Sequence, residues 1–168
     1  MDQKNYYIPI TSVPESAFHD GACLYNFDQL RTQYAWDSGI AIGEYLAGLR
    51  EGKILGAKCP HCHRVMVPPR TFCEWCFQPI NEFIPLLDSG TVLTYSICYV
   101  TWDVQRISEP EIPAVIEIDG ASKNHGILHK LSEVDPNRVS IGMRVRAVWK
   151  PTQERIGDIT DILYFRPE

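Results

Sequence analysis

Cys59-Pro-His-Cys62 and Cys73-Glu-Trp-Cys76 are two Cys-x-x-Cys motifs that stand ten residues apart. In each motif the two-residue spacer lets both sulfur atoms point at one centre, so the pair supplies the four soft ligands of a closed tetrahedral site. Zinc suits such a site, and a closed site leaves no open position for water. We therefore expect these four cysteines to hold a structural zinc ion that performs no chemistry.

Three alternatives compete with zinc at these cysteines. Rubredoxin-type iron also uses two such motifs, but they usually carry glycine after the second cysteine, where this chain has His63 and Phe77. Disulfides would need an oxidising compartment, and the chain opens Met-Asp-Gln-Lys-Asn without an apolar signal segment. His61 and His63 could each replace a thiolate, although four thiolates are already available. A reducing cytoplasm is the expected setting.

Length, composition and charge limit what the rest of the chain can be. With 168 residues, of which 45% are hydrophobic, the chain can bury one modest core, or two small modules of which a metal site stabilises one. Its formal net charge of −5 repels polyanions, which disfavours nucleic-acid binding. No stretch approaches the roughly 20 consecutive apolar residues of a membrane span, and neither end carries a lipidation motif. We therefore expect no membrane or nucleic-acid partner.

The chain divides into four stretches, residues 1–37, 38–58, 59–86 and 87–168. The first is rich in aromatic residues, which are Tyr6, Tyr7, Phe18, Tyr25, Phe27, Tyr34 and Trp36. Disordered tails are poor in such residues, so we expect this extension to lie across a surface of this chain or of a partner. Within it, Asp28 to Trp36 could form a short helix.

The second stretch predicts a helix of roughly three turns, with Ser38 as its cap. Its apolar positions follow the i, i+3, i+4, i+7 spacing of one buried face. They are Ile42, Tyr45, Leu46 and Leu49. Gly39, Gly43 and Ala47 form a neighbouring stripe of small residues, which either permits close approach of another element or is simply tolerated. Gly52 ends the helix, because glycine readily adopts the left-handed cap conformation.

The residues around the two cysteine motifs have the order of a zinc ribbon. Lys53 to Ala57 is expected to form a short strand that leads into the first motif. Arg64 to Pro69 forms the arm between the motifs, and Pro79 to Pro85 is expected to be a linker that leads out of the ribbon.

The fourth stretch is expected to be all-β. Its five candidate strands are Thr91–Val100, Ala114–Ile118, His125–Leu131, Arg144–Trp149 and Ile159–Phe165. Ser132 or Asp135 can cap a single helical turn between the third and fourth strands. Glycines at the expected bends are Gly90, Gly120, Gly126 and Gly142. This order matches an OB-fold. The predicted fold is therefore mainly β with N-terminal helices, with a rubredoxin-like zinc ribbon followed by a five-stranded OB-fold barrel.

Five motifs follow one another between about residues 38 and 168. They are Tyr45-Leu-Ala-Gly-Leu-Arg-Glu-Gly-Lys-Ile-Leu, Cys59-Pro-His-Cys, Val67-Pro-Pro-Arg-Thr-Phe-Cys, Ser89-Gly-Thr-Val-Leu-Thr-Tyr-Ser and Ile141-Gly-Met-Arg-Val-Arg-Ala-Val-Trp. In this order they resemble the DUF35 family of acyl-CoA-associated proteins. The resemblance implies a thiolase-like partner subunit that supplies the nucleophilic cysteine. The two chains would form a hetero-oligomer, and one stoichiometry is two copies of each. This chain would help to form the acyl-CoA site, and it is too short to be a thiolase by itself.

Coenzyme A at a site shared with that partner would need a few convergent cations for its phosphates and an apolar wall. The candidates are Arg70, Lys123, His125, Arg144 and Arg146. Arg144 and Arg146 have the same parity, so both side chains should emerge on one face of a strand. For each candidate, a solvated charge or an ion pair is the competing interpretation.

No set of residues suggests that the chain catalyses a reaction alone. Cys98 lies mid-strand, where a buried inert thiol is the ordinary interpretation. Cys23 lacks the strand-to-helix turn that would present a nucleophile. Glu117 and Asp119 alternate with isoleucines, as on the polar face of a half-buried strand. We therefore assign no catalytic residue.

The main alternative function is single-stranded nucleic-acid binding, because OB-folds stack bases on aromatic side chains. Tyr95, Tyr99, Trp102 and Trp149 are available for this role. The chain lacks the long basic stripe that such binding also needs.

Overall fold

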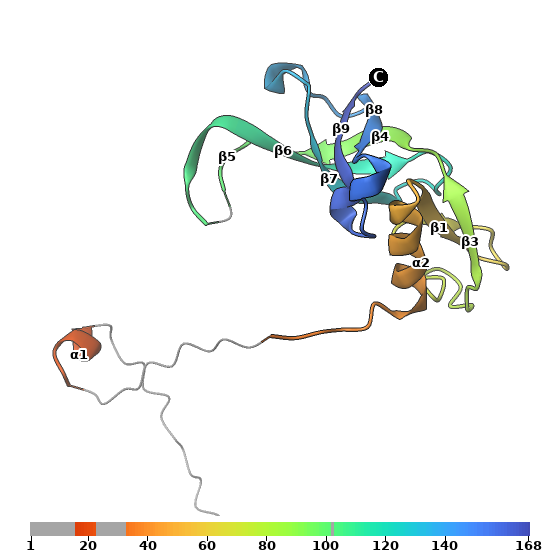
Figure 1. Cartoon of the computed structure of the whole chain (residues 1–168), viewed down its shortest axis with the longest axis horizontal. Coiled ribbons are helices and arrows are strands. Elements are labelled where there is room, and N and C mark those ends of the chain that lie inside the picture. The colour runs from red at the N-terminus through yellow and green to blue at the C-terminus, as the bar shows by residue number, and fades with distance from the viewer. Residues whose placement is uncertain (1–15, 23–32, 102) are drawn as a thin grey trace, which may run out of the picture. The chain divides into compact units, whose positions relative to one another are not determined.

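The structure is a computed structural model that describes residues 16–22, 33–101 and 103–168 (Figure 1). The helices are α1 (Ser16–His19), α2 (Gly39–Arg50) and the short 3-10 turns η1 (Pro136–Arg138), η2 (Thr152–Glu154) and η3 (Ile159–Asp161). The strands are β1 (Ile54–Lys58), β2 (Val65–Met66), β3 (Glu82–Leu86), β4 (Ser89–Tyr95), β5 (Cys98–Val100), β6 (Arg106–Ile118), β7 (Gly126–Leu131), β8 (Arg144–Trp149) and β9 (Ile162–Pro167). The chain is therefore mainly β, as predicted.

The contacts divide the chain into two compact units, Met1–Trp36 and Asp37–Glu168. Most of the aromatic extension and most of the helix expected at Asp28–Trp36 lie outside the described residues, and residues 33–36 are not helical. The rings of Tyr34 and Trp36 lie 6.2 Å apart, and both side chains are exposed. Among the residues that the structure describes, no helix has the length and apolar character needed to cross a membrane.

The helix α2 begins one residue after the predicted cap. Ser38 occupies the cap position, but its side chain makes no capping bond, and Asp37 Oδ1 accepts instead from the Gly39 N–H at 3.1 Å. The helix ends as predicted, because Gly52 adopts a left-handed φ of +77° and its N–H bonds to the Leu49 carbonyl.

The buried face of α2 matches the predicted one at Tyr45 and Leu49 and departs from it at Ile42. Its buried residues are Ala41, Tyr45, Gly48 and Leu49, whereas Ile42 is exposed. The close approach occurs at Gly48, where an added Cβ would lie 2.7 Å from Leu55 Cγ. A Cβ at Gly39 or Gly43 would meet nothing within 4 Å, so those two glycines are tolerated rather than required by packing.

The ribbon is a three-stranded antiparallel sheet in the order β2-β1-β3. Lys58 lies opposite Val65 on one side and opposite Glu82 on the other. The prediction that Pro79–Pro85 is a linker is therefore wrong, because β3 pairs with β1 along its whole length. Proline at position 85 is compatible with this strand because β3 lies at the edge of the sheet, where one backbone N–H can be missing.

Five strands close into a barrel in the order β4-β8-β9-β7-β6, and β6 pairs back with β4. The strand predicted at Arg144–Trp149 coincides with β8. Asp135, rather than Ser132, caps the helical turn η1 by accepting from the Asn137 N–H at 2.9 Å. The barrel and its interrupting turn thus follow the predicted OB-fold.

Three barrel strands differ from their predicted bounds by more than one residue. The strand predicted at Ala114–Ile118 is the inner end of β6, which begins at Arg106. The predicted strand Thr91–Val100 divides into β4 and β5, because the strand is interrupted at Ser96 and Ile97. The outer part of β6 pairs with β5 as a hairpin arm that projects from the barrel (Figure 1). The strand predicted from Ile159 begins at Ile162, because the preceding residues form η3 with a capping box.

The main core joins the helix, the ribbon and the barrel. Tyr45 and Leu49 of α2 and Ile54 of β1 belong to one buried cluster with Ile116 of β6 and Phe165 of β9. A second, smaller cluster holds the ribbon together and contains Ala57, Cys59, Met66, Cys73 and Ile80. Because the first cluster spans all three parts, α2 and β1 position the ribbon against the barrel.

Candidate metal centre and charged surfaces

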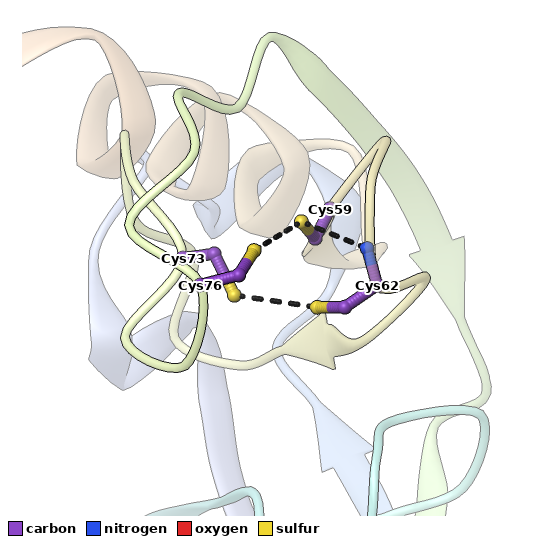
Figure 2. A group of neighbouring side chains, drawn as sticks. All are labelled: Cys59, Cys62, Cys73 and Cys76. Atoms are coloured by element: carbon purple, nitrogen blue, oxygen red, sulfur yellow. Dashed lines mark hydrogen bonds between the residues drawn. The ribbon is translucent and has the colours of Figure 1, made fainter.

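The four cysteines predicted to bind metal lie together at the end of the ribbon (Figure 2). Their sulfur atoms all lie within 4.8 Å of one another, and the Cys59–Cys76 and Cys62–Cys73 pairs are each 3.5 Å apart. Zn–S bonds of about 2.3 Å in a tetrahedron place the sulfurs roughly 3.8 Å apart. The arrangement therefore fits a closed tetrathiolate zinc site.

Each cysteine motif forms the same tight turn. The Cys59 N–H bonds to the Arg64 carbonyl, and the Cys73 N–H bonds to the Gln78 carbonyl, both at 2.8 Å. The residue after each second cysteine is left-handed, with φ of +60° at His63 and +57° at Phe77. His63 and Phe77 thus adopt the left-handed conformation that glycine readily takes. The absence of glycine at these two positions therefore does not distinguish zinc from iron.

Backbone N–H groups favour the thiolate form at the first ligand of each motif. The Cys62 N–H points at Cys59 Sγ at 3.5 Å and lowers the pKa of Cys59 to about 6. The backbone N–H of Cys76 likewise lowers the pKa of Cys73. Thiolates are the form that binds metal, so these N–H groups favour metal binding at Cys59 and Cys73, whereas burial and the neighbouring sulfurs raise the pKa of Cys62 and Cys76. His61 and His63 are exposed and lie outside the group of sulfurs.

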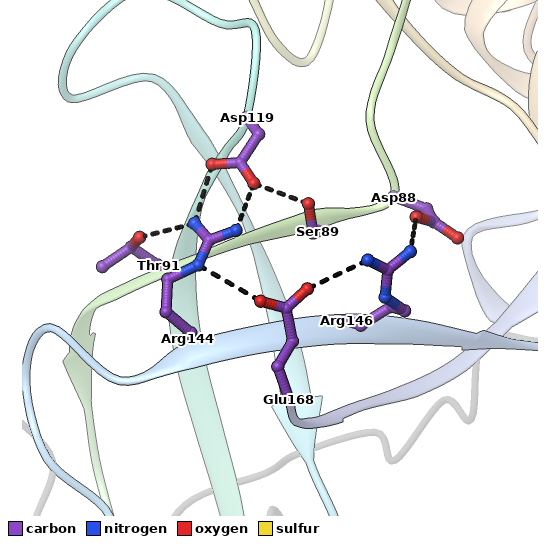
Figure 3. Close-up of polar contacts among 7 residues, drawn as sticks. All are labelled: Asp88, Ser89, Thr91, Asp119, Arg144, Arg146 and Glu168. Atoms are coloured by element: carbon purple, nitrogen blue, oxygen red, sulfur yellow. Dashed lines mark hydrogen bonds and ion pairs between the residues drawn. The ribbon is translucent and has the colours of Figure 1, made fainter.

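Arg144 and Arg146 emerge on one face of β8 as predicted, but each faces carboxylates (Figure 3). Arg144 pairs with Asp119 through both terminal nitrogens, and its Nε lies 3.4 Å from Glu168. Arg146 lies 2.9 Å from Asp88 and 3.1 Å from Glu168. Hydrogen bonds from Arg144 lower the pKa of Asp119 to about 2. These two cations are therefore neutralised within the chain.

Arg70 and His125 come together around Glu74, inside the second cysteine motif. Arg70 lies 2.7 Å from Glu74, and the Nε2 atom of His125 lies 3.2 Å from it. Nε2 of His125 also lies 2.8 Å from a terminal nitrogen of Arg64, whose hydrogen bond a neutral imidazole ring can accept. Burial lowers the pKa of His125, which favours this neutral form. Arg64 stacks on Trp75 at 4.7 Å from the ring centroid.

The turn between β6 and β7 joins this cluster to the barrel. Ser122 in that turn donates its N–H to the Val65 carbonyl at 2.8 Å and accepts the Val65 N–H at 2.9 Å. The neighbouring Lys123 is exposed and has no ion-pair partner among the described residues. Within the part of the chain that the structure describes, the five predicted cations thus fall into two separate groups and one lysine without an ion-pair partner.

Sequence patterns did not identify Glu74, Arg64 or Ser122 as members of this junction. The i, i+4 spacing of Arg70 and Glu74 could have suggested their pairing. No local pattern could have brought Arg64 to His125, because 61 positions separate them.

The remaining candidates show no convergent arrangement. Cys98 is half-buried at the start of β5, so the prediction of a buried mid-strand thiol is wrong, and Cys23 lies outside the described residues. Glu117 and Asp119 lie on the polar side of β6 and its continuation, and they alternate with the buried Ile116 and Ile118.

Two of the four aromatic side chains considered for base stacking are engaged or covered. The Tyr95 hydroxyl donates to the Val139 carbonyl at 2.9 Å, and Arg155 covers the half-buried ring of Trp149. Tyr99 is exposed on the hairpin arm, and Trp102 lies outside the described residues. These contacts disfavour a continuous stacking platform.

Family models match both parts of the second unit. A model described as the ChsH2 rubredoxin-like zinc ribbon domain matches residues 46–80, and one described as the ChsH2 C-terminal OB-fold domain matches residues 84–150. A DUF35 domain-containing scaffold protein of Methanocaldococcus jannaschii is 31% identical over 118 residues, which cover 68% of this chain and 81% of the relative. A protein of the same description from Methanothermobacter thermautotrophicus is 24% identical over 102 residues, or 60% of this chain and 74% of the relative.

Solved structures share the fold. A DUF35 protein of unknown function from Sulfolobus solfataricus is 24% identical, with a TM-score of 0.57, covering 74% of this chain and 83% of that one. The structure described as Ltp2-ChsH2(DUF35) aldolase is 18% identical, with a TM-score of 0.58, covering 80% of this chain and 98% of that one. This chain belongs to the DUF35 family and carries its zinc ribbon and OB-fold domains.

Proposed function

We propose that this chain is a non-catalytic, zinc-binding scaffold subunit of a thiolase-like enzyme. The observation that carries the proposal is its 31% identity, over most of both chains, to a relative described as a scaffold protein. The solved structure described as an Ltp2–ChsH2 aldolase supports an enzyme partner, because a ChsH2 (DUF35) chain is named there together with Ltp2. The four-cysteine site supports a structural role, since a tetrathiolate site offers no open position for substrate.

In the proposed complex, zinc has a structural role, because it stabilises the fold of the ribbon. The sulfurs of Cys59, Cys62, Cys73 and Cys76 hold the ribbon, and the junction from Val65 to Ser122 fixes the ribbon against the barrel. The nucleophilic cysteine belongs to the partner subunit. This division of roles requires no catalytic group on the described residues of this chain.

We further propose that the complex binds coenzyme A or acyl-CoA at a site shared by the two subunits. Lys123 is exposed and can contact a phosphate without first leaving an ion pair with a described residue. Arg70 and His125 lie nearby, around Glu74. Arg144 and Arg146 would first have to exchange their carboxylate partners for the phosphate. The narrower proposal is thiolysis of 2-benzoylsuccinyl-CoA by coenzyme A to benzoyl-CoA and succinyl-CoA in anaerobic toluene degradation. It rests on the long aromatic extension, which resembles the small subunit of benzoylsuccinyl-CoA thiolase.

Purification of the tagged chain from its native host tests the scaffold role. We expect a thiolase-like polypeptide of several hundred residues to accompany it, and the complex to cleave 2-benzoylsuccinyl-CoA only when coenzyme A is supplied. If the tagged chain purifies alone, the proposal of a partner enzyme subunit is wrong. A complex that forms but leaves this substrate intact would overturn the narrower substrate and leave the scaffold role standing.

A further inference from the structure

The barrel is held together weakly between β7 and β9. β7 pairs with β6 over six positions, from Ile112 opposite Leu131 to Glu117 opposite Gly126. On its other side β7 pairs with β9 at a single position, where Leu131 lies opposite Phe165. Among the described residues, no strand is therefore hydrogen-bonded to the edge of β7 from Gly126 to His129, although β9 lies nearby. We call this gap the seam.

The backbone groups that face the seam can be assigned from their neighbours. The Ser132 N–H crosses the seam to the Phe165 carbonyl at 2.9 Å. The Lys130 N–H is taken by the ring of His129, through Nδ1 at 3.0 Å. Because backbone groups alternate along a strand, Leu128 directs its N–H and carbonyl to the same side as these two residues. The seam thus presents a free strand edge centred on Leu128.

An open groove of about 400 Å³ lies along this edge. Leu128 of β7, Ile159 of η3 and Leu163 of β9 line it with exposed apolar surface, and the exposed fraction of Leu128 is 68%. His129 also lines the groove, with Nε2 lying 3.4 Å from the Ile159 carbonyl oxygen and its ring in an edge-to-face contact with Phe165.

Two lysines form the rim of the groove, in a chain whose net charge is −5. Lys130 has no ion-pair partner among the described residues, and Lys150 bonds to the Thr160 hydroxyl at 2.9 Å. Lys150 also forms an ion pair at 3.9 Å with Asp161, whose buried carboxylate accepts three backbone N–H groups, so the uncompensated positive charge of the rim among the described residues lies at Lys130. The groove is therefore apolar on its walls and positive at its rim.

We propose that the seam binds an extended segment of the partner enzyme subunit, which adds a strand to the free edge of β7. Its apolar side chains would cover Leu128, Ile159 and Leu163, and a carboxylate would lie between Lys130 and Lys150. Strand addition of this kind takes affinity from backbone hydrogen bonds and specificity from side-chain pockets. The proposal rests on the scaffold function for the existence of the partner, and goes beyond it by naming the docking surface and the chemistry of its occupant.

A second copy of this chain and a nucleic acid fit the groove less well. Two copies meeting groove to groove would oppose the same lysine rims. A single-stranded nucleic acid needs a positive track along its backbone, and two lysines supply only a short one.

The proposal is tested on the complex purified from the host, with glutamate substitutions at exposed positions. Leu128→Glu and Lys130→Glu should each weaken binding of the co-purified thiolase-like subunit by about tenfold or more, since interface anchors contribute most of the binding energy. The matched control is Ile141→Glu, which changes an equally exposed side chain away from the seam and should bind within about twofold of wild type. Hydrogen exchange at the Leu128 amide should slow when the wild-type complex forms.

The outcomes separate this proposal from the scaffold function. If the wild-type chain binds its thiolase-like partner, but both seam variants bind equally well and the Leu128 amide exchanges as before, the seam proposal is wrong and the scaffold function stands. If no enzyme subunit binds, both are wrong. Protection of the Leu128 amide by self-association or by an oligonucleotide would also overturn the proposed occupant.

Discussion

Gly126 in β7 lies so close to β6 that a single added methyl group should destabilise the barrel. A Cβ at this position would lie 2.2 Å from the Ile116 carbonyl oxygen and 2.7 Å from its carbon. The contact is with backbone, which cannot rotate away as a side chain can. On the opposite side of β6, a Cβ at Gly90 would lie 2.3 Å from the Glu117 carbonyl oxygen. β6 is therefore confined between two glycines, and moving it away from one strand drives it into the other.

The magnitude of the Gly126→Ala change follows from these distances. Overpacking costs about 1–3 kcal/mol, and strained ladder hydrogen bonds add about 1 kcal/mol. Alanine also lowers the conformational entropy of the unfolded chain, which offsets about 0.5–1 kcal/mol of this destabilisation. We expect a net loss of about 1–3.5 kcal/mol in the free energy of unfolding. For a unit of this size the melting temperature should fall by roughly 4–14 °C.

Urea and thermal unfolding of the zinc-loaded protein, followed by circular dichroism, measure this loss. The matched control is Gly43→Ala in α2, where the added Cβ meets nothing within 4 Å. Removing a glycine from a helix interior should stabilise that variant by about 0.5–1 kcal/mol. Zinc content should be unchanged in both variants, since neither residue belongs to the ribbon. If Gly126→Ala unfolds within about 0.5 kcal/mol of wild type while the control gains stability, the confinement of β6 is refuted.

Three further predictions concern the buried hydroxyl, an ion pair and the metal. Tyr45→Phe should leave stability unchanged or raise it by up to about 1 kcal/mol, because the buried Tyr45 hydroxyl has no hydrogen-bond partner among the described residues; a clear loss in urea unfolding would indicate a bound water instead. Asp119→Asn should cost about 1 kcal/mol at pH 7, since the pair with Arg144 is partly exposed. Because Arg144 lowers the folded-state pKa of Asp119 to about 2, below the unfolded value, this stabilisation is present above about pH 4 and is lost as the pH falls toward 2; a difference between wild type and variant that persists at pH 2 would contradict the pairing. Cys59→Ser should abolish stoichiometric zinc binding and assembly with the enzyme subunit, as measured by metal analysis and co-purification, and a variant that assembles normally would show that zinc is dispensable.

Local patterns predicted the parts of the fold whose causes are local. The spacing of Cys59 and Cys62 sets the turn of the first cysteine motif, and the left-handed Gly52 ends α2 as expected. Asp135 caps its helical turn through a bond to a residue two positions away. In these cases the residues that determine the structure are neighbours in sequence, so the pattern contains the required information.

The errors occurred where long-range contacts override local preference. Two prolines suggested a linker at Pro79–Pro85, but pairing with β1 makes most of it a strand. Ile42 fits the apolar periodicity of α2, yet the buried side of the helix follows from how it packs on β1 and the barrel. Periodicity gives the existence of a helix, whereas the direction of its buried face depends on its neighbours.

The sequence by itself determined the four-cysteine site, the ribbon followed by an OB-fold, and the resemblance to DUF35 proteins, because closely spaced ligands and alternating strands leave local signatures. Only the tertiary structure decided that Arg144 and Arg146 are neutralised by Asp119, Asp88 and Glu168, which lie 22 to 58 positions away. It also decided that β7 keeps a free edge beside a lysine-rimmed groove. Charge pairing and strand exposure depend on which distant segments meet, and no local spacing encodes that.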